Sequence, residues 1–404
     1  MHKKSQVCED KRDYVGRVFQ HMKPNTEKTY RTTINKYEKF HGCSFNELIE
    51  EALEEQEKGI PEHKLSIYDR IMEFRDYLID NYVFTTVNQD ITRVKTVYKR
   101  SRVKLPYFPP LERKQCKQNP VIDYWEVLSK EEIREALDWF LPNMKARIMI
   151  MATGGYSLEE TATMTIRQFV EDLYPYHQQD DPEKAMAVLS VKDNIVWLTK
   201  MVRVKTGKSY YGVTNPETVQ AIAQSWINRD IDDIDAPLFR QTKQWVTKHM
   251  GEINDVLGFG QAGGFRRFTP HSLRRYNATN LGGASLSQTE ELSINMIDEI
   301  QGRSMSDVQD RYIKTNPIKQ KLMYIKVMNN VSLFNQYTYE IFNGDIVVHR
   351  IDPNKKLEKL ENENDVLKQK LNNQHKADEE LKKYIEVVGK DNFQERVLKL
   401  LHEL

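Results

Sequence analysis

Two short stretches of this 404-residue chain decide how it is interpreted: Thr269-Pro270-His271-Ser272-Leu273-Arg274-Arg275, and Gln301-Gly302-Arg303-Ser304 followed by Asp310-Arg311-Tyr312. Residues three apart in a helix share one face, so His271 and Arg274 can converge on one small anion. Arg303 and Tyr312 follow Arg274 within 38 residues. An imidazole, two guanidiniums and a phenol are the groups that cleavage of a phosphodiester through a phosphotyrosine requires.

The composition is typical of a soluble, helix-rich protein. With 39% hydrophobic and 29% charged residues, the chain is expected to fold into two or three domains. No run approaches the roughly 18 apolar residues of a membrane span, and the start, Met-His-Lys-Lys-Ser, lacks the apolar core of a signal peptide. The three cysteines are far apart in the sequence, which argues against a disulfide framework or a CxxC metal site. We therefore expect a cytoplasmic protein without a membrane partner and without a metal site.

Charge is segregated along the chain. Residues 44–60 are acidic and predict a solvated surface helix or loop. Residues 91–118 carry nine basic side chains and one acid, Glu112, with aromatic residues interleaved. A basic helix followed by a basic linker is typical of contact with nucleic-acid phosphates, although a plain solvated face fits this pattern too. The residues predicted to contact DNA are Arg93, Lys95, Lys99, Arg100, Arg102 and Lys104.

Hydrophobic periodicity divides the chain into parts. Residues 10–108 predict a helical domain, with long helices from about residue 25, through residues 67–78, and up to about residue 102. Residues 109–124 form a linker. Residues 125–335 predict helices around a β-hairpin with strands 195–204 and 209–213, turning at Lys205-Thr206-Gly207-Lys208. The predicted fold class is mainly α with a small β-hairpin or sheet (α+β).

The last part, residues 354–404, carries a heptad pattern. Apolar residues, among them Leu357, Leu360, Leu367 and Leu371, occupy alternating a and d positions. Asn364 falls at an a position, where a buried amide favours a parallel two-stranded coil. The tail therefore predicts a coiled coil through which copies of the chain associate on DNA as a dimer or tetramer. A helix that packs within its own chain is the alternative.

In their order along the chain, the basic helical domain, the hairpin, His271-x-x-Arg274 and Tyr312 resemble the tyrosine recombinase, or phage integrase, family. The resemblance covers roughly residues 20–330. It implies a core DNA-binding domain and a catalytic domain that clamp double-stranded DNA between them. It also implies that a tyrosine breaks one strand, leaving a 3′-phosphotyrosyl bond and a free 5′-hydroxyl, without ATP, a metal ion or another cofactor.

The resemblance assigns roles to five residues. Tyr312 is the expected nucleophile, and its separation of nine residues from Arg303 is typical of the family. Lys205, on the hairpin turn, is expected to protonate the leaving 5′-oxygen, with Lys208 as the fallback. Arg274, His271 and Arg303 are expected to stabilise the phosphate. Arg303 stands where His or Trp is common, and Gly-Arg at this point is similar to integrases of archaeal mobile elements.

One position departs from the family pattern. Residues 155–160, Gly-Tyr-Ser-Leu-Glu-Glu, align with the family's Gly-x-Arg-x-x-Glu, so Ser157 stands where the first of two phosphate-binding arginines is expected. Serine brings no charge, and removing a guanidinium from a transition-state site can cost on the order of several kcal/mol. Either Arg147, Arg167 or Arg275 replaces this arginine in space, or the enzyme is slow or inactive.

Three functions stay open on this sequence. The first is a site-specific DNA recombinase or integrase, located in the cytoplasm and associated with the nucleoid. The second is a DNA-binding protein on the same scaffold that has lost cleavage, a hypothesis motivated by Ser157. The third is a nicking and closing enzyme similar to type IB topoisomerases, since its chemistry is the same.

Overall fold

The structure is a computed structural model that describes residues 13–283, 291–303, 316–342, 345–352 and 367–370, with residues 379, 382, 383 and 386. Within these residues the chain is mostly helical, and its strands pair as three separate two-stranded antiparallel hairpins. The predicted fold class, mainly α with a small hairpin or sheet, is confirmed. Tyr312 and nearly all of the predicted coiled coil, residues 354–404, lie outside the described residues. No helix in the described ranges is both long and apolar enough to span a membrane.

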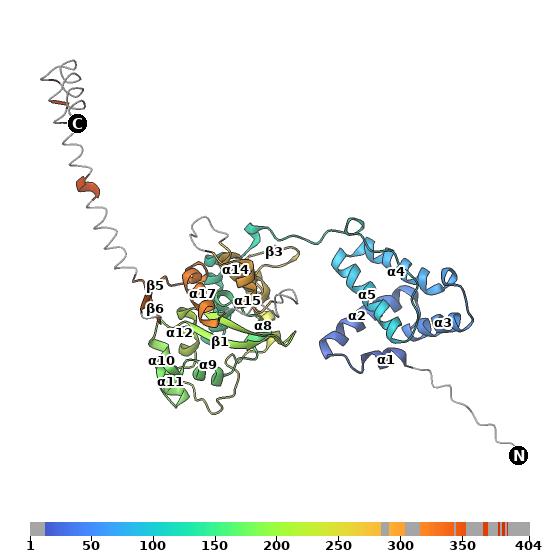
Figure 1. Cartoon of the computed structure of the whole chain (residues 1–404), viewed down its shortest axis with the longest axis horizontal. Coiled ribbons are helices and arrows are strands. Elements are labelled where there is room, and N and C mark those ends of the chain that lie inside the picture. Colours follow the sequence, from blue (N-terminus) through green and yellow to red (C-terminus); the bar gives the residue numbers. More distant parts are fainter. Residues whose placement is uncertain are drawn as a thin grey trace. The chain divides into compact units, whose positions relative to one another are not determined.

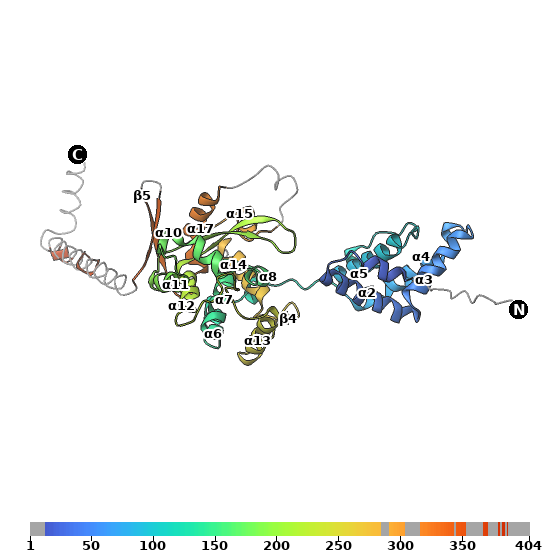
Figure 2. The same cartoon turned by 90° about the horizontal axis from the view of Figure 1, so that it is seen from below.

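The chain divides into two compact units, Met1–Ile122 and Asp123–Leu404, drawn in Figures 1 and 2. The N-terminal unit consists of helices with two short 3-10 turns, Glu62–Lys64 and Arg113–Gln115. Its helices are α1 (Tyr14–Phe19), α2 (Pro24–His41), α3 (Phe45–Glu57), α4 (Ser66–Asn81) and α5 (Phe84–Arg100).

Local sequence signals set the helix ends of this unit. Proline at the first position begins α2, and Gly42, at a positive φ of 72°, ends it. Ser44 and Glu47 form a capping box that begins α3. The acidic segment is therefore a helix, and its inner face is apolar and packs into the core, while its acids face outward. The buried residues of α3 are Phe45, Leu48, Ile49 and Ala52.

The C-terminal unit is built around one buried helix, α7 (Pro142–Thr153). Ten of its twelve residues are buried, because α12, α14 and α17 pack against it (Figure 2). The other helices of the unit surround this core or link it. They are α6 (Lys130–Leu137), α8 (Leu158–Thr161), α9 (Ile166–Asp172), α10 (Tyr174–His177), α11 (Pro182–Val191), α12 (Pro216–Gln224), α13 (Lys243–Val256), α14 (Pro270–Leu281), α15 (Ile294–Ile300) and α17 (Pro317–Val331), with a 3-10 turn at Tyr124–Glu126.

Three hairpins complete the unit. They are β1 (Trp197–Val202) with β2 (Ser209–Thr214), β3 (Gln261–Ala262) with β4 (Phe265–Arg266), and β5 (Tyr337–Phe342) with β6 (Asp345–Arg350). The β1–β2 hairpin is the one that the sequence predicted. Its register pairs Trp197 with Thr214 and Val202 with Ser209, so that Trp197 and Met201 face the core.

The β1–β2 hairpin is held close to α15 and α17, which contact β2 (Figure 1). A glycine makes one of these approaches possible. Gly302, just after α15, has a φ of 60°, and a Cβ added there would lie 2.5 Å from the ring of Tyr210 on β2. Only glycine fits this backbone conformation and this space together. The end of α15 is thereby held against the hairpin.

Candidate active site

The His-x-x-Arg element lies in the first turns of α14. Thr269 caps this helix, because its side chain accepts a hydrogen bond from the backbone N–H of Ser272 (3.2 Å), and Pro270 occupies the first helical position. His271 is exposed, whereas Arg274, one turn later on the same face, is buried. The helix therefore presents an accessible imidazole beside a fixed guanidinium.

Arg274 is held by one carboxylate and one carbonyl. Its Nη1 donates to Oε2 of Glu160 (3.2 Å), and its Nη2 donates to the carbonyl of Gln301. Both side chains of the ion pair are almost fully buried, at 6% and 1% exposure. Burial lowers the pKa of Arg274, and the charge of Glu160 opposes that effect. The guanidinium stays charged, because its ordinary pKa lies far above neutral pH.

Three consecutive backbone carbonyls, those of Gln301, Gly302 and Arg303, accept hydrogen bonds from cationic side chains of α14 and of the β1–β2 hairpin. Gln301 accepts from Arg274 on α14. Gly302 accepts from Nη1 of Arg203, at the end of β1, and Arg303 accepts from Nζ of Lys208 (3.2 Å), before β2. We call residues 301–303 the carbonyl segment. It brings the hairpin and α14 to one place.

Arg303 adds a further guanidinium to this place. Its Nη1 lies 3.5 Å from Oδ1 of Asp298, and its side chain is 40% exposed. Partial burial lowers the pKa of His271 below its ordinary 6.5, and the charges of Arg275, Arg274 and Arg303 lower it further. Both effects favour the neutral form of the imidazole. Three of the predicted site residues, His271, Arg274 and Arg303, thus come within electrostatic reach of one another.

The two lysines of the hairpin turn differ. Lys208 is partly buried and contacts the carbonyl of Arg303. Lys205 is exposed in the turn, where Gly207 adopts a φ of 71°. The exposed ammonium of Lys205 can reach a ligand, whereas the ammonium of Lys208 binds the Arg303 carbonyl and helps to hold the hairpin in place. Lys205 is therefore the more exposed of the two lysines.

The side chain of Ser157 caps the N-terminus of helix α8. Its oxygen accepts from the backbone N–H of Glu160 (3.3 Å), and the Glu160 carboxylate accepts from the backbone N–H of Ser157 (2.7 Å). This capping box begins α8. Glu160 thus has two functions, since the same Oε2 also binds Arg274. Ser157 contributes a cap, and no charge, at the aligned position.

The arginines considered as replacements lie elsewhere. Arg147 is fully buried and donates to Thr161, Gln241 and Leu158, which uses all three of its nitrogens within the protein. Burial lowers its pKa to about 10. Arg167 is partly exposed and makes a bidentate ion pair with Asp235, at 2.6 and 2.9 Å. These two arginines cannot serve the site without breaking those contacts.

Arg275, the third candidate, is half-buried and follows Arg274 on α14. Its positive charge is felt by His271. Burial lowers the pKa of Arg275, and the Glu126 carboxylate opposes that effect. A different arginine, Arg203, which the sequence did not identify, contacts the carbonyl segment directly.

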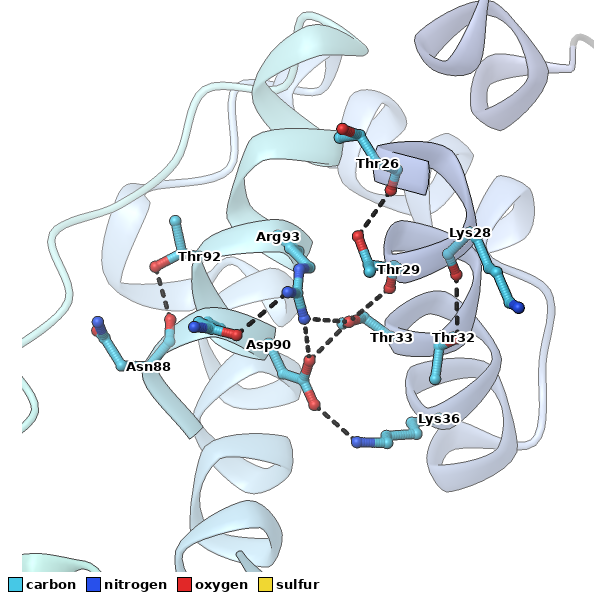
Figure 3. A network of polar contacts seen from close by, with 11 residues as sticks. Thr26, Lys28, Thr29, Thr32, Thr33, Lys36, Asn88, Asp90, Thr92 and Arg93 are labelled. Carbon is cyan, nitrogen blue, oxygen red and sulfur yellow. Dashed lines mark hydrogen bonds and ion pairs between the residues drawn. The ribbon is translucent and has the colours of Figure 1, made fainter. Parts of the chain in front are cut away.

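The basic residues of the N-terminal unit divide into two groups. Arg93 donates to the buried carboxylate of Asp90 (2.9 Å), which also binds Lys36 (2.9 Å) and Thr33 (2.6 Å), as Figure 3 shows. Lys95 lies 4.1 Å from the centre of the Phe108 ring. These two cations hold the unit together. The remaining predicted contacts, Lys99, Arg100, Arg102 and Lys104, are exposed near the end of α5.

Tyr312 lies between Arg303 and Asn316, the residues at which the described chain stops and resumes, so its contacts are not described. Among the described residues, no group of three His, Cys, Asp or Glu side chains is arranged to hold a metal ion.

No protein-family model matches the sequence, and no curated protein matches it. Among solved structures, the chain is similar to the crystal structure of XerA recombinase, at 16% identity and a TM-score of 0.32, over 76% of this chain and 94% of that one. It is also similar to the Tn1549 transposon integrase in complex with transposon right end DNA, at 14% identity and a TM-score of 0.46, over 75% and 94%. The same integrase in complex with circular intermediate DNA gives 15% identity and a TM-score of 0.41, over 75% and 94%.

Proposed function

We propose that this chain is a site-specific DNA recombinase or integrase that breaks and rejoins double-stranded DNA through a 3′-phosphotyrosyl intermediate. The observation that carries the proposal is the buried Arg274 held at the carbonyl segment, one helical turn after His271, whose pKa the charges of Arg274 and Arg303 help to lower. Cations gathered around one point, with Glu160 and Asp298 as their carboxylate partners, suit a phosphate diester. Arg274 is preorganised by burial, so it need not be reoriented when charge develops on the phosphate.

Each residue has a chemical role in the proposed reaction. The phenol oxygen of Tyr312 attacks the phosphorus, the bond from phosphorus to the 5′-oxygen breaks, and a phosphotyrosyl bond replaces it. The neutral imidazole of His271 accepts the phenol proton. Lys205 donates a proton to the departing 5′-oxygen, which leaves as a hydroxyl. Attack by a 5′-hydroxyl of another strand reverses these steps and rejoins the DNA.

A covalent capture experiment tests this proposal. The whole chain is incubated with a pool of random-sequence duplexes nicked near the centre, so that cleavage releases a short fragment and traps the protein on DNA. We expect a covalent adduct on a denaturing gel, and sequencing of the trapped DNA identifies the site. Tyr312→Phe should abolish the adduct, and an adduct that persists in that variant would reject the nucleophile assignment.

A non-catalytic DNA-binding protein is the second candidate, and Ser157 is the observation that favours it. The aligned position carries a cap and no guanidinium. On this hypothesis the chain retains selected sequences from the same random pool without forming any adduct. Tight binding with no covalent product would therefore establish the second candidate.

We also propose that the exposed end of α5 binds DNA phosphates. Four cations, Lys99, Arg100, Arg102 and Lys104, are exposed there within six residues. Removing one cation that neutralises a phosphate lowers the salt dependence of binding by about 0.9 in the log–log slope. Replacing Lys99 and Arg100 by glutamine should thus reduce the slope by about 2, whereas Lys58→Gln, whose ammonium pairs with Glu54, should leave it unchanged.

A further inference from the structure

The proposed reaction requires charge that residue 157 does not supply. A phosphate diester gains negative charge as the tyrosine oxygen attacks, and that charge is shared by the two non-bridging oxygens. Arg274 can bind one of them or bridge both. The side chain of Ser157 is committed to capping α8, and Arg147 and Arg167 are committed to other contacts. A second buried or half-buried guanidinium beside Arg274 would complete the site.

Arg203 has a rigid backbone at the base of the hairpin turn. Its N–H donates to the carbonyl of Lys208 (2.8 Å), and its carbonyl accepts from the N–H groups of Thr206 (3.2 Å) and Gly207 (2.7 Å). Its side chain is half-buried and donates from Nη1 to the carbonyl of Gly302. Within the residues that the structure describes, this is the one hydrogen bond of the Arg203 guanidinium, made by one of its three nitrogens.

Arg203 and Arg274 are bound to neighbouring peptide groups. The carbonyl of Gly302 holds Arg203, and the preceding carbonyl, of Gln301, holds Arg274. Consecutive Cα atoms are about 3.8 Å apart, so the two anchors belong to one small region. The two charges also act on each other, since Arg203 and Arg303 both lower the pKa of Arg274, after the larger effect of burial. Two guanidiniums held this close, of which Arg274 is paired with the carboxylate of Glu160, favour an anion between them.

We propose that Arg203 is a catalytic residue that clamps the scissile phosphate together with Arg274 and replaces the charge missing at Ser157. This inference rests on the proposed recombinase function. It places one phosphate clamp on α14 and the other on the hairpin that also carries Lys205. No bond is made or broken by Arg203, which donates hydrogen bonds to a non-bridging oxygen while Tyr312 and Lys205 carry out the transfer.

The test uses two substrates that differ only in charge. One is the trapped DNA sequence with its natural phosphate at the cleavage point, and the other has an uncharged methylphosphonate there. With the phosphate, Arg203→Gln should form adduct about 100-fold more slowly than the unchanged chain, as expected for the loss of one transition-state donor. With the methylphosphonate, where there is less charge to stabilise, the difference should fall below about 10-fold. Arg203→Lys, which keeps the charge but not the planar fork, should give an intermediate rate on the phosphate.

Control variants distinguish a role of Arg203 in binding the phosphate from a purely structural role. Arg167→Gln removes a partly exposed guanidinium from the same unit and should leave adduct formation unchanged on both substrates. DNA affinity and thermal stability of Arg203→Gln should stay close to those of the unchanged chain. An equal loss on both substrates, or no loss on either, would overturn the role of Arg203. If the unchanged chain forms no adduct, the proposed function fails and this inference fails with it.

Discussion

Replacing Glu160 with glutamine changes one atom and removes the carboxylate charge that pairs with Arg274. The two side chains meet at 3.2 Å, and both are almost fully buried. Glutamine fits the third position of a capping box as well as glutamate, so the cap of α8 is retained. Oε2 of Glu160 accepts from both Ser157 and Arg274, so the new amide group takes the place of Oε1. The substitution therefore isolates the charge.

The magnitude follows from the burial of the pair. Breaking a buried ion pair by removing one partner costs about 3–5 kcal/mol, because the remaining charge is left in a poorly solvated place. Glutamine still offers Arg274 a neutral acceptor, worth about 1 kcal/mol. We therefore expect Glu160→Gln to lower the free energy of unfolding of the C-terminal unit by about 2–4 kcal/mol. Adduct formation should fall as well, because Arg274 loses the carboxylate that orients it.

Urea denaturation measures this change. Tryptophan fluorescence reports on the C-terminal unit, since all five tryptophans lie in it and Trp197 is fully buried. The adjacent Glu159 supplies a matched control, because its ion pair with Lys243 is largely exposed. Glu159→Gln should cost less than about 1 kcal/mol. If Glu160→Gln is no more destabilising than this control, the Arg274 pair is solvated, and preorganisation of Arg274 by burial is refuted.

Three further predictions concern other parts of the molecule. Asp90→Asn should destabilise the N-terminal unit by about 1–3 kcal/mol, measured by calorimetry of the whole chain, whereas exposed Asp76→Asn should change it by less than about 0.5 kcal/mol. Gly302→Ala and Gly207→Ala each place a side chain on a backbone with positive φ, but only the new Cβ at position 302 also lies against an aromatic ring, at 2.5 Å. In urea unfolding, Gly302→Ala should therefore lower the free energy of unfolding by at least about 1 kcal/mol more than Gly207→Ala does. A bound phosphate should raise the lowered pKa of His271, so DNA binding should take up protons and tighten as the pH falls. Calorimetry in two buffers of different ionisation enthalpy measures this uptake, and an equal uptake in His271→Gln would contradict the prediction.

The parts of the site that the sequence predicted are those that local geometry determines. His271 and Arg274 share a helix face because they are three residues apart, and Thr269 and Pro270 mark the start of that helix. The β1–β2 hairpin follows from its apolar alternation and its turn. The contact between Arg203 and Gly302 joins residues 99 apart, and it depends on how the hairpin packs against the end of α15. No local pattern identifies such a contact, so Arg203 could not be found from the sequence alone.

The ion pair between Arg93 and Asp90 could have been anticipated from the sequence. Arg93 was predicted as a phosphate contact because it lies in a basic segment. Asp90, three residues earlier, falls on the buried face of α5 with Val87, Ile91 and Val94. A carboxylate on an apolar helix face requires a cation, and a residue three positions along is within reach. The periodicity that predicts the helix therefore also indicates that the charge of Arg93 is used within the fold.

The carbonyl segment explains how the site can tolerate serine at position 157. The carboxylate of Glu160 makes two contacts, one that caps α8 and one that pairs with Arg274. The capping box formed by Ser157 and Glu160 holds the carboxylate in position for both contacts. An arginine at 157 would lose the side-chain oxygen that completes this cap. On the proposed assignment the second guanidinium instead comes from Arg203, on the same hairpin as Lys205. Two roles, clamping the phosphate and protonating the leaving oxygen, then depend on one hairpin. A change that loosens the hairpin, such as Gly302→Ala, should therefore reduce adduct formation more than it reduces DNA binding, since on the proposed function the N-terminal unit also binds DNA.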